Sequence, residues 1–307
     1  MQSTAADRLR HAARVTRDAL RLWLDSDAFS HAGSLAFYTL FSLAPVVIIA
    51  VTIIGVVLGE QAAQGQIVGQ LQDLMGAEAA AAVEQAVARS RIRESGLLPT
   101  LLGAGALVLG ATTVFGQMQH SLNNIWGVAA RPNRSGLFAL LKRRLLSLTV
   151  VLAIGFVLLV SLLLGLVLRA FLHFTHQFVP AVVALLSTAE LLLSWLATSM
   201  LFAAIFKVLP DVVLRWRDVL VGALVTALLF SVGKYAIALY LTHTATASTY
   251  GAAGSVVLIL LWVYYSSLIL LFGAAFTKVQ MLAGGGSVVP RNSAVRVQRE
   301  RIVDAAG

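Results

Sequence analysis

The stretch VLVGALVTALLFSVGKYAIALYL, residues Val219–Leu241, carries a single charged side chain, that of Lys234. A bilayer core about 30 Å thick requires about 20 apolar residues in a helix, so this stretch predicts a membrane-spanning helix. A lysine at the centre of such a helix costs about 2.5–3.5 kcal/mol on insertion scales. Because this cost is high, Lys234 is either paired with another group or part of a functional site.

Five further stretches of this kind predict an all-α polytopic membrane protein with six transmembrane helices. The chain is 59% hydrophobic and only 12% charged, whereas soluble domains have about 25% charged residues. The six predicted spans contain only two side chains of the Asp, Glu, Lys or Arg type, those of Glu190 and Lys234. The spans are expected at residues 35–59, 97–118, 145–168, 180–206, 219–241 and 254–277.

The positions of Lys and Arg predict the orientation. Eighteen of them lie in the N-terminal segment, the second and fourth connections and the C-terminal tail, and four lie in the first, third and fifth connections. Positive charge collects in cytoplasmic loops, so both termini are expected in the cytoplasm. The net charge of +9 has the same explanation, and no nucleic-acid partner is predicted.

Three segments flank or interrupt the predicted transmembrane domain, residues 35–282. Residues 1–34 are expected to form a basic cytoplasmic segment, and residues 5–24 within it predict an amphipathic helix. One stripe of this helix consists of Leu9, Ala13, Thr16, Leu20 and Trp23. A basic stripe beside it consists of Arg10, Arg14, Arg17 and Arg21. Such a helix suits an anionic membrane surface, and a solvated helix covering the bundle is the alternative. Residues 60–96 predict a helical periplasmic loop, and residues 283–307, with three glycines at 284–286, predict a flexible basic cytoplasmic tail.

Glu190 is the candidate partner of Lys234. The predicted spans that carry them are joined by a short turn, and such neighbours usually pack together. Both residues lie about 5–6 Å to the outer side of their span centres at 1.5 Å per residue. Pairing would lower the cost of each charge, and two readings stay open: a static clasp that sets helix register, or a functional site.

Several strings resemble the YihY/BrkB family of bacterial inner-membrane proteins over roughly residues 25–280. They are LAFYTLFSLAP at 35–45, NNIW at 123–126, the segment LPDVVLRW with the span that follows it, and YGAAGSVVLILLWVYYSS from 250 onward. Lys234 matches a lysine typical of the family, but this chain has Ala275 where the family usually has Glu. The family-like residues expected to shape the bundle are Pro45, Asn124, Trp126, Gly251, Gly254 and Trp262.

The resemblance implies a multi-pass protein of the bacterial inner membrane with no settled activity. Members of the family have carried a ribonuclease label and a virulence-factor name. A role in moving lipids or lipid-linked glycans has been suggested for members. We expect a transporter or lipid-handling protein for an anionic lipid or lipid-linked substrate, and a structural scaffold is the alternative. A two-metal nuclease needs converging carboxylates, and no acidic residue occurs between Glu94 and Glu190.

Membrane lipids with anionic headgroups are therefore the predicted partners, and homo-oligomerisation stays open. No catalytic residue, metal or cofactor is predicted. The candidate substrate-binding residues line a groove around the lysine: Lys234, Glu190, Tyr38, Ser42, Tyr235, Tyr265 and, more loosely, Tyr240.

Overall fold

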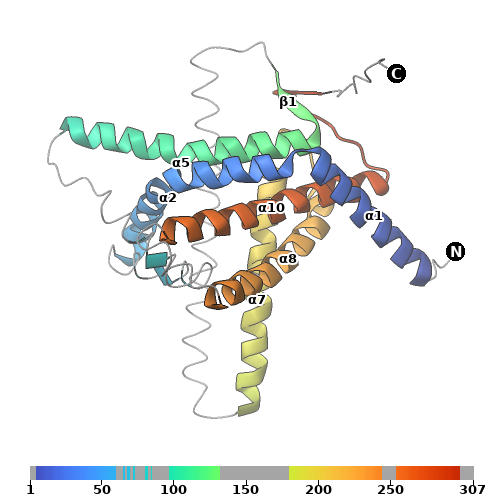
Figure 1. Ribbon diagram of the computed structural model, residues 1–307, viewed down its shortest axis with the longest axis horizontal. Helices are drawn as coiled ribbons and strands as arrows, with labels where there is room; N and C mark the ends of the chain where they lie inside the picture. Colours follow the sequence, from blue (N-terminus) through green and yellow to red (C-terminus); the bar gives the residue numbers. More distant parts are fainter. Residues whose placement is uncertain are drawn as a thin grey trace.

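The computed structural model describes residues 5–59, 97–131, 180–243 and 254–297, together with residues 65, 68–69, 72, 80–81 and 84. Helices dominate these residues, which confirms the all-α class, and two three-residue strands join them (Figure 1). The elements are α1 (Ala5–Asp25), α2 (Ala28–Leu58), α5 (Leu97–Trp126), β1 (Val128–Ala130), α7 (Pro180–Val208), α8 (Trp216–His243), α10 (Gly254–Ala283) and β2 (Ala294–Arg296).

Five of the six predicted spans fall on described helices. These helices have 28 to 31 residues, which at 1.5 Å per residue is about 42–47 Å. Among the described residues, Trp216–Ile237 and Val256–Ala283 are both long and apolar enough to cross a membrane, and Ser194–Val208 is a shorter apolar stretch. The predicted third span, 145–168, and most of the predicted 60–96 loop lie outside the described residues. The six-span count and the sidedness of the termini therefore stay predictions.

Helices α2 and α5 extend furthest beyond the predicted apolar runs. Helix α2 begins at Ala28 rather than at residue 35, and α5 continues to Trp126 rather than ending at residue 118. The added turns are polar or contain small residues, but Ala28, Ala32, Leu122 and Trp126 are buried. Hydropathy marks where a helix can meet lipid, whereas contacts with other helices decide where it ends.

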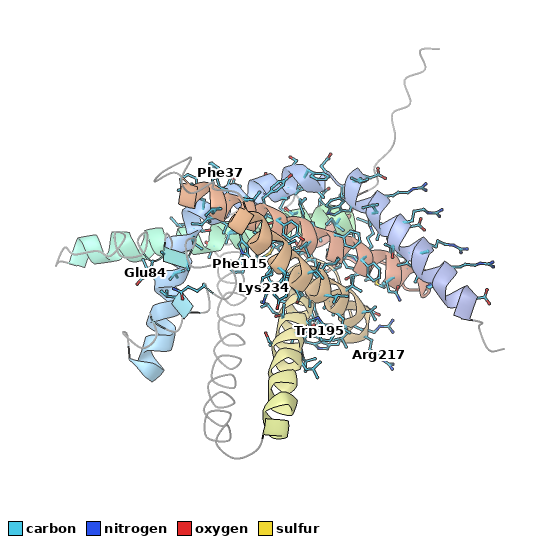
Figure 2. The ribbon with its side chains drawn as sticks, turned by 60° about the horizontal axis from the view of Figure 1, so that its bottom comes forward. Phe37, Glu84, Phe115, Trp195, Arg217 and Lys234 are labelled. Atoms are coloured by element: carbon cyan, nitrogen blue, oxygen red, sulfur yellow. The ribbon has the colours of Figure 1, made fainter. Side chains whose placement is uncertain are left out.

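Helix α10 lies at the centre of the described bundle and contacts α1, α2, α5 and α8. Helices α2, α5 and α10 run alongside one another, and α7 crosses them steeply (Figure 1). The predicted packing of the fourth and fifth spans is confirmed, because α7 and α8 are in contact. In both views, however, the N-terminal part of α7 extends beyond the other helices (Figures 1 and 2).

The interface between α8 and α10 is built from two reciprocal glycine–threonine contacts. A β-carbon at Gly222 would overlap the side chain of Thr277, and one at Gly273 would overlap the side chain of Thr226. The threonine hydroxyls are satisfied within their own helices, at 2.6 Å from Thr226 Oγ1 to Gly222 O and 2.7 Å from Thr277 Oγ1 to Gly273 O. Small residues thus let the two backbones approach closely, as in other membrane helix pairs.

The predicted amphipathic helix at 5–24 is confirmed as α1, and Trp23 is the member of the predicted stripe that contacts the bundle. Val15 and Ala19 are buried, α1 packs on α10, and Trp23 Nε1 donates to Leu268 O at 3.2 Å. Thr16 and Leu20 of the predicted stripe are exposed. Asp27, with a φ of 53°, forms the corner that separates α1 from α2.

Residues 284–297, part of the tail 283–307 for which the sequence predicted flexibility, make backbone pairs with other segments, and we name them the C-terminal strap. Its strand β2 pairs antiparallel with β1, with Ala130 opposite Ala294, and Pro290 bridges to Val212. Three glycines start the strap, and Gly285 has a φ of 80°, a conformation that glycine adopts without strain. Composition suggested disorder because it does not register backbone pairing with a distant strand.

Candidate functional site

The last turns of α5 hold the connection between α7 and α8. Asn123 Nδ2 donates to Asp211 Oδ2 at 2.8 Å, and the backbone N–H of Asp211 donates to Asn123 Oδ1 at the same distance. Gln119 Nε2 and Ser293 Oγ also donate to the Asp211 carboxylate, at 3.3 and 3.4 Å. The carboxylate is therefore surrounded by donors from α5 and from the strap.

Asn124, the second asparagine of the NNIW string, holds the corner between α1 and α2. Its Nδ2 donates to Ser26 O at 2.9 Å and lies 2.8 Å from His31 Nε2. Since an amide nitrogen can only donate, His31 Nε2 accepts. Ser121 Oγ lies 3.2 Å from His31 Nδ1 and itself donates to Gln117 O, so Nδ1 carries the proton of this imidazole.

Cationic side chains bind backbone carbonyls at the C-terminal ends of two helices and in the turn before α8. Lys278 Nζ donates to Ile125 O near the end of α5 at 2.8 Å. Arg291 of the strap donates to Lys207 O and Val208 O at the end of α7, at 3.0 and 3.2 Å, and Lys207 Nζ donates to Leu214 O at 2.7 Å. Positive charge at helix C-termini is favourable because the last carbonyls lack intrahelical partners.

These contacts surround a cavity of about 1170 Å³. The cavity lies where the ends of α1, α5, α7 and α10 meet the strap. Apolar groups such as Leu22, Ile125 and Leu209 form part of the wall. The polar part of the wall consists of Asp25, Ser26, Gln119, His120, Asn123, Asn124, Asp211, Lys278, Arg291 and Ser293.

The cavity contains one residue that the sequence had singled out, Asn124. Trp126 of the same string does not line it and is buried in the core instead. Asp211, Lys278 and Arg291 were missed as site residues, because one sequence shows them only as charges near span ends. A usable signal existed: Asn, Asp and Lys recur near several span ends predicted to lie on the same side.

Lys234 lies elsewhere, on α8, 18 residues from the start of that helix, which is about 27 Å at 1.5 Å per residue. Its side chain is half-buried. Among the side chains that the structure describes, the partner found for its Nζ is the ring of Tyr235, 5.6 Å from the ring centroid. Tyr235 is 67% exposed, so Lys234 lies next to an open face of α8 (Figure 2 labels the lysine).

Tyr265 of α10 packs against Gly233, which precedes Lys234 in the chain. A β-carbon at Gly233 would overlap the Tyr265 ring, so this glycine makes room for the tyrosine against α8. Tyr265 thus lies against the neighbour of Lys234, and the predicted role of Tyr235 and Tyr265 in substrate binding stays a prediction. Ser42 is buried on α2, where its hydroxyl donates to Tyr38 O at 2.7 Å, and the structure gives neither Ser42 nor Tyr38 a contact with Lys234.

The remaining predicted residues divide into two groups. Trp262 is buried on α10, where its ring contacts Phe230 of α8. Glu190 lies in α7, but its side chain is outside the described part of the structure, so its pairing with Lys234 stays a prediction. The side chains of Pro45 and Tyr240, and the surroundings of Gly251 and Gly254, are outside it as well. Ala275, which replaces the usual family Glu, is fully buried in the core.

Comparison with known families assigns most of the chain. The family model described as virulence factor BrkB matches residues 19–287. The match includes every helix described here except the first two thirds of α1. No solved structure matches the chain.

Curated relatives carry the name UPF0761 membrane protein. The one from Mannheimia succiniciproducens is 26% identical over 81% of this chain and 83% of its own length. The one from Tolumonas auensis is 31% identical over 58% of this chain. The one from Nitrosospira multiformis is 30% identical over 79%. The chain spans only 56% and 55% of the lengths of these last two.

Proposed function

The chain belongs to the BrkB family of membrane proteins, and from this premise we propose that it is a multi-pass inner-membrane protein that moves or handles an anionic lipid or lipid-linked substrate. The family assignment confirms the resemblance stated above. The substrate class rests on the chemistry of the residues described here.

The observation that carries the proposal is the position of Lys234. It is the single charge between Val219 and Leu241, half-buried on α8, beside the exposed ring of Tyr235. Leu228 and Val232 are 56% and 60% exposed on the same helix, which suits contact with lipid tails. A cation beside such a face suits an anionic headgroup, and ionisable residues inside membrane helices commonly mark substrate pathways.

The polar cavity beside the connection that precedes α8 adds support. It provides hydrogen-bonding groups where the helix ends meet, so a polar headgroup would find partners there as well as at Lys234. Helix α10 contacts both α5, beside the cavity, and α8, which carries Lys234. The proposal does not require a continuous path between the two places.

The test is lipid movement by the purified full-length chain in vesicles. Fluorescent analogues with a phosphatidylglycerol or a phosphatidylcholine headgroup are reconstituted with the protein, and a membrane-impermeant reductant reports the fraction in the outer leaflet. We expect faster movement of the anionic analogue with the native chain, loss of that preference in Lys234→Met and partial retention in Lys234→Arg. Arg217→Met, which removes an exposed charge near the start of α8, is the matched control and should behave as the native chain.

Two results would contradict the proposal. If the native chain moved neither analogue, or if Lys234→Met moved both at native rates, the lysine would have no role in lipid passage. A structural scaffold would then be the better account of the protein. Leaflet-resolved lipid analysis of a deletion strain would identify the substrate if the first result is positive.

A further inference from the structure

Helix α1 has two apolar faces, and the described part of the protein covers one of them. The inner face is held against α10 by Val15 and Ala19, which are 2% and 0% exposed, and by the Trp23 hydrogen bond. On the other side Leu20 and Leu24 are 45% and 50% exposed. Phe29, just after the corner, is 49% exposed, so three large apolar side chains at this end of α1 lie open.

The contact with α10 indicates the depth of these side chains. Trp23 Nε1 bonds to Leu268 O, and Leu268 lies 15 residues before the end of α10 at Ala283, about 22 Å at 1.5 Å per residue. Lys278, which bonds to the end of α5, is ten residues nearer to the C-terminal end of α10 than Leu268 is. Trp23 therefore contacts α10 within the stretch 256–283, which is apolar enough to span a membrane. Leu24, next to it in the chain, lies near the same depth.

Four arginines lie on the exposed side of α1. Arg10, Arg14, Arg17 and Arg21 are all exposed, and at 100° per residue they lie within about 120° of Leu20 around the helix. Arg17 forms an ion pair with Asp18 at 3.3 Å, and solvent reaches both side chains, so this pair contributes little. The N-terminal part of α1 extends beyond the other helices (Figure 1).

We infer that α1 is an interfacial helix whose outer face binds the anionic surface of the same membrane that holds α8 and α10. Leu20, Leu24 and Phe29 contact the acyl chains, and the four arginines contact lipid phosphates. A helix with an apolar stripe beside basic residues binds membranes in this way. The inference does not depend on lipid movement by Lys234. Helix α1 contacts the helix bundle with one face and the bilayer with the other.

The test uses the full-length protein in vesicles, and the absence of native cysteine makes single labels simple. Leu24→Cys carries a nitroxide, and His11→Cys, an exposed position on another side of α1, carries the matched control. In vesicles containing phosphatidylglycerol, we expect relaxation by oxygen to dominate at residue 24 and relaxation by a water-soluble nickel chelate to dominate at residue 11. Leu20→Cys serves as a second position for the outer face.

Charge is tested separately. Each of Arg14→Gln, Arg17→Gln and Arg21→Gln should lower the ratio of immersed to water-exposed label at residue 24 about fivefold, because each basic residue near an anionic surface contributes a factor of that size. Vesicles of phosphatidylcholine alone should have the same effect as removing the arginines. Equal nickel accessibility at residues 24 and 11 would overturn the inference, and unchanged immersion in neutral vesicles would overturn its electrostatic part.

Discussion

Asn123 and Asp211 are 88 residues apart in the chain and meet through two hydrogen bonds of 2.8 Å. The amide supplies a donor to the carboxylate and an acceptor to the backbone N–H of Asp211. Hydrogen bonds to a charged group contribute about 1.5–3 kcal/mol, and this pair joins α5 to the turn before α8. The NNIW string thus has a structural role that is independent of any substrate.

We expect Asn123→Asp to destabilise the protein by at least about 2 kcal/mol, because it removes a charge-assisted donor and places two carboxylates in contact. Asp211→Asn alone should also destabilise it. The double variant Asn123→Asp/Asp211→Asn restores one donor and one carboxylate with their roles exchanged, so most of the loss should be recovered. Thermal unfolding in detergent measures all three, and additive losses in the double variant would show that the contact is absent.

Lys234 allows a second double-variant experiment at this scale. If Lys234 and Glu190 form a buried pair, removing either partner should cost about 3–5 kcal/mol, and removing both should be nearly neutral. Lys234→Met, Glu190→Gln and the combination are compared by thermal unfolding in detergent. Additive effects would mean that the two residues do not meet. Recovered stability without recovered lipid movement would favour a functional lysine over a clasp.

At the scale of elements, the α8–α10 interface depends on residues that have no β-carbon. Gly222 and Gly273 receive the side chains of Thr277 and Thr226, so the distance between the two helices is set by these contacts. Since α10 also contacts α1, α2 and α5, a shift of α10 relative to α8 would change its packing against those helices too.

We therefore expect Gly222→Ala to destabilise the protein by about 1–3 kcal/mol through overpacking. Gly116→Ala in α5 is the control: nothing lies within 4 Å of a β-carbon there, and replacing a glycine inside a helix by alanine should stabilise by up to about 1 kcal/mol. Thr277→Ala in the Gly222→Ala background should recover part of the loss. If Gly222→Ala and Gly116→Ala changed the thermal stability in the same direction, the packing argument would be refuted.

At the scale of the whole molecule, the described helix ends that carry the polar contacts lie together. The corner at Ser26, the end of α5, the turn around Asp211 and the strap are joined by hydrogen bonds. They must consequently lie on the same side of the membrane, whichever side that is. The distribution of Lys and Arg predicts that this side is the cytoplasm.

Topology reporters test this assignment. Fusions at residues 135 and 213 should report the cytoplasm, and fusions at residues 78 and 247 should report the outside, because the arginine-rich and lysine-rich connections stay inside. The hydrogen-bonded cluster adds that the signal at residue 213 must match that of the N-terminal segment. One reporter of opposite sign would exclude the arrangement of six spans.

The sequence by itself determined the helical class, the approximate positions of five described helices, the amphipathic nature of α1 and the family, because these follow from apolar run length, periodicity and local strings. Tertiary structure alone decided that polar turns extend α5 to Trp126, that α1 turns Val15 and Ala19 rather than Leu20 toward the bundle, and that residues 284–297 pair with β1. It also brought Asn123, Asp211 and Arg291 to one cavity. The physical reason is that hydropathy records each segment's preference for lipid, whereas hydrogen bonds and close packing depend on residues that the chain brings together from far apart.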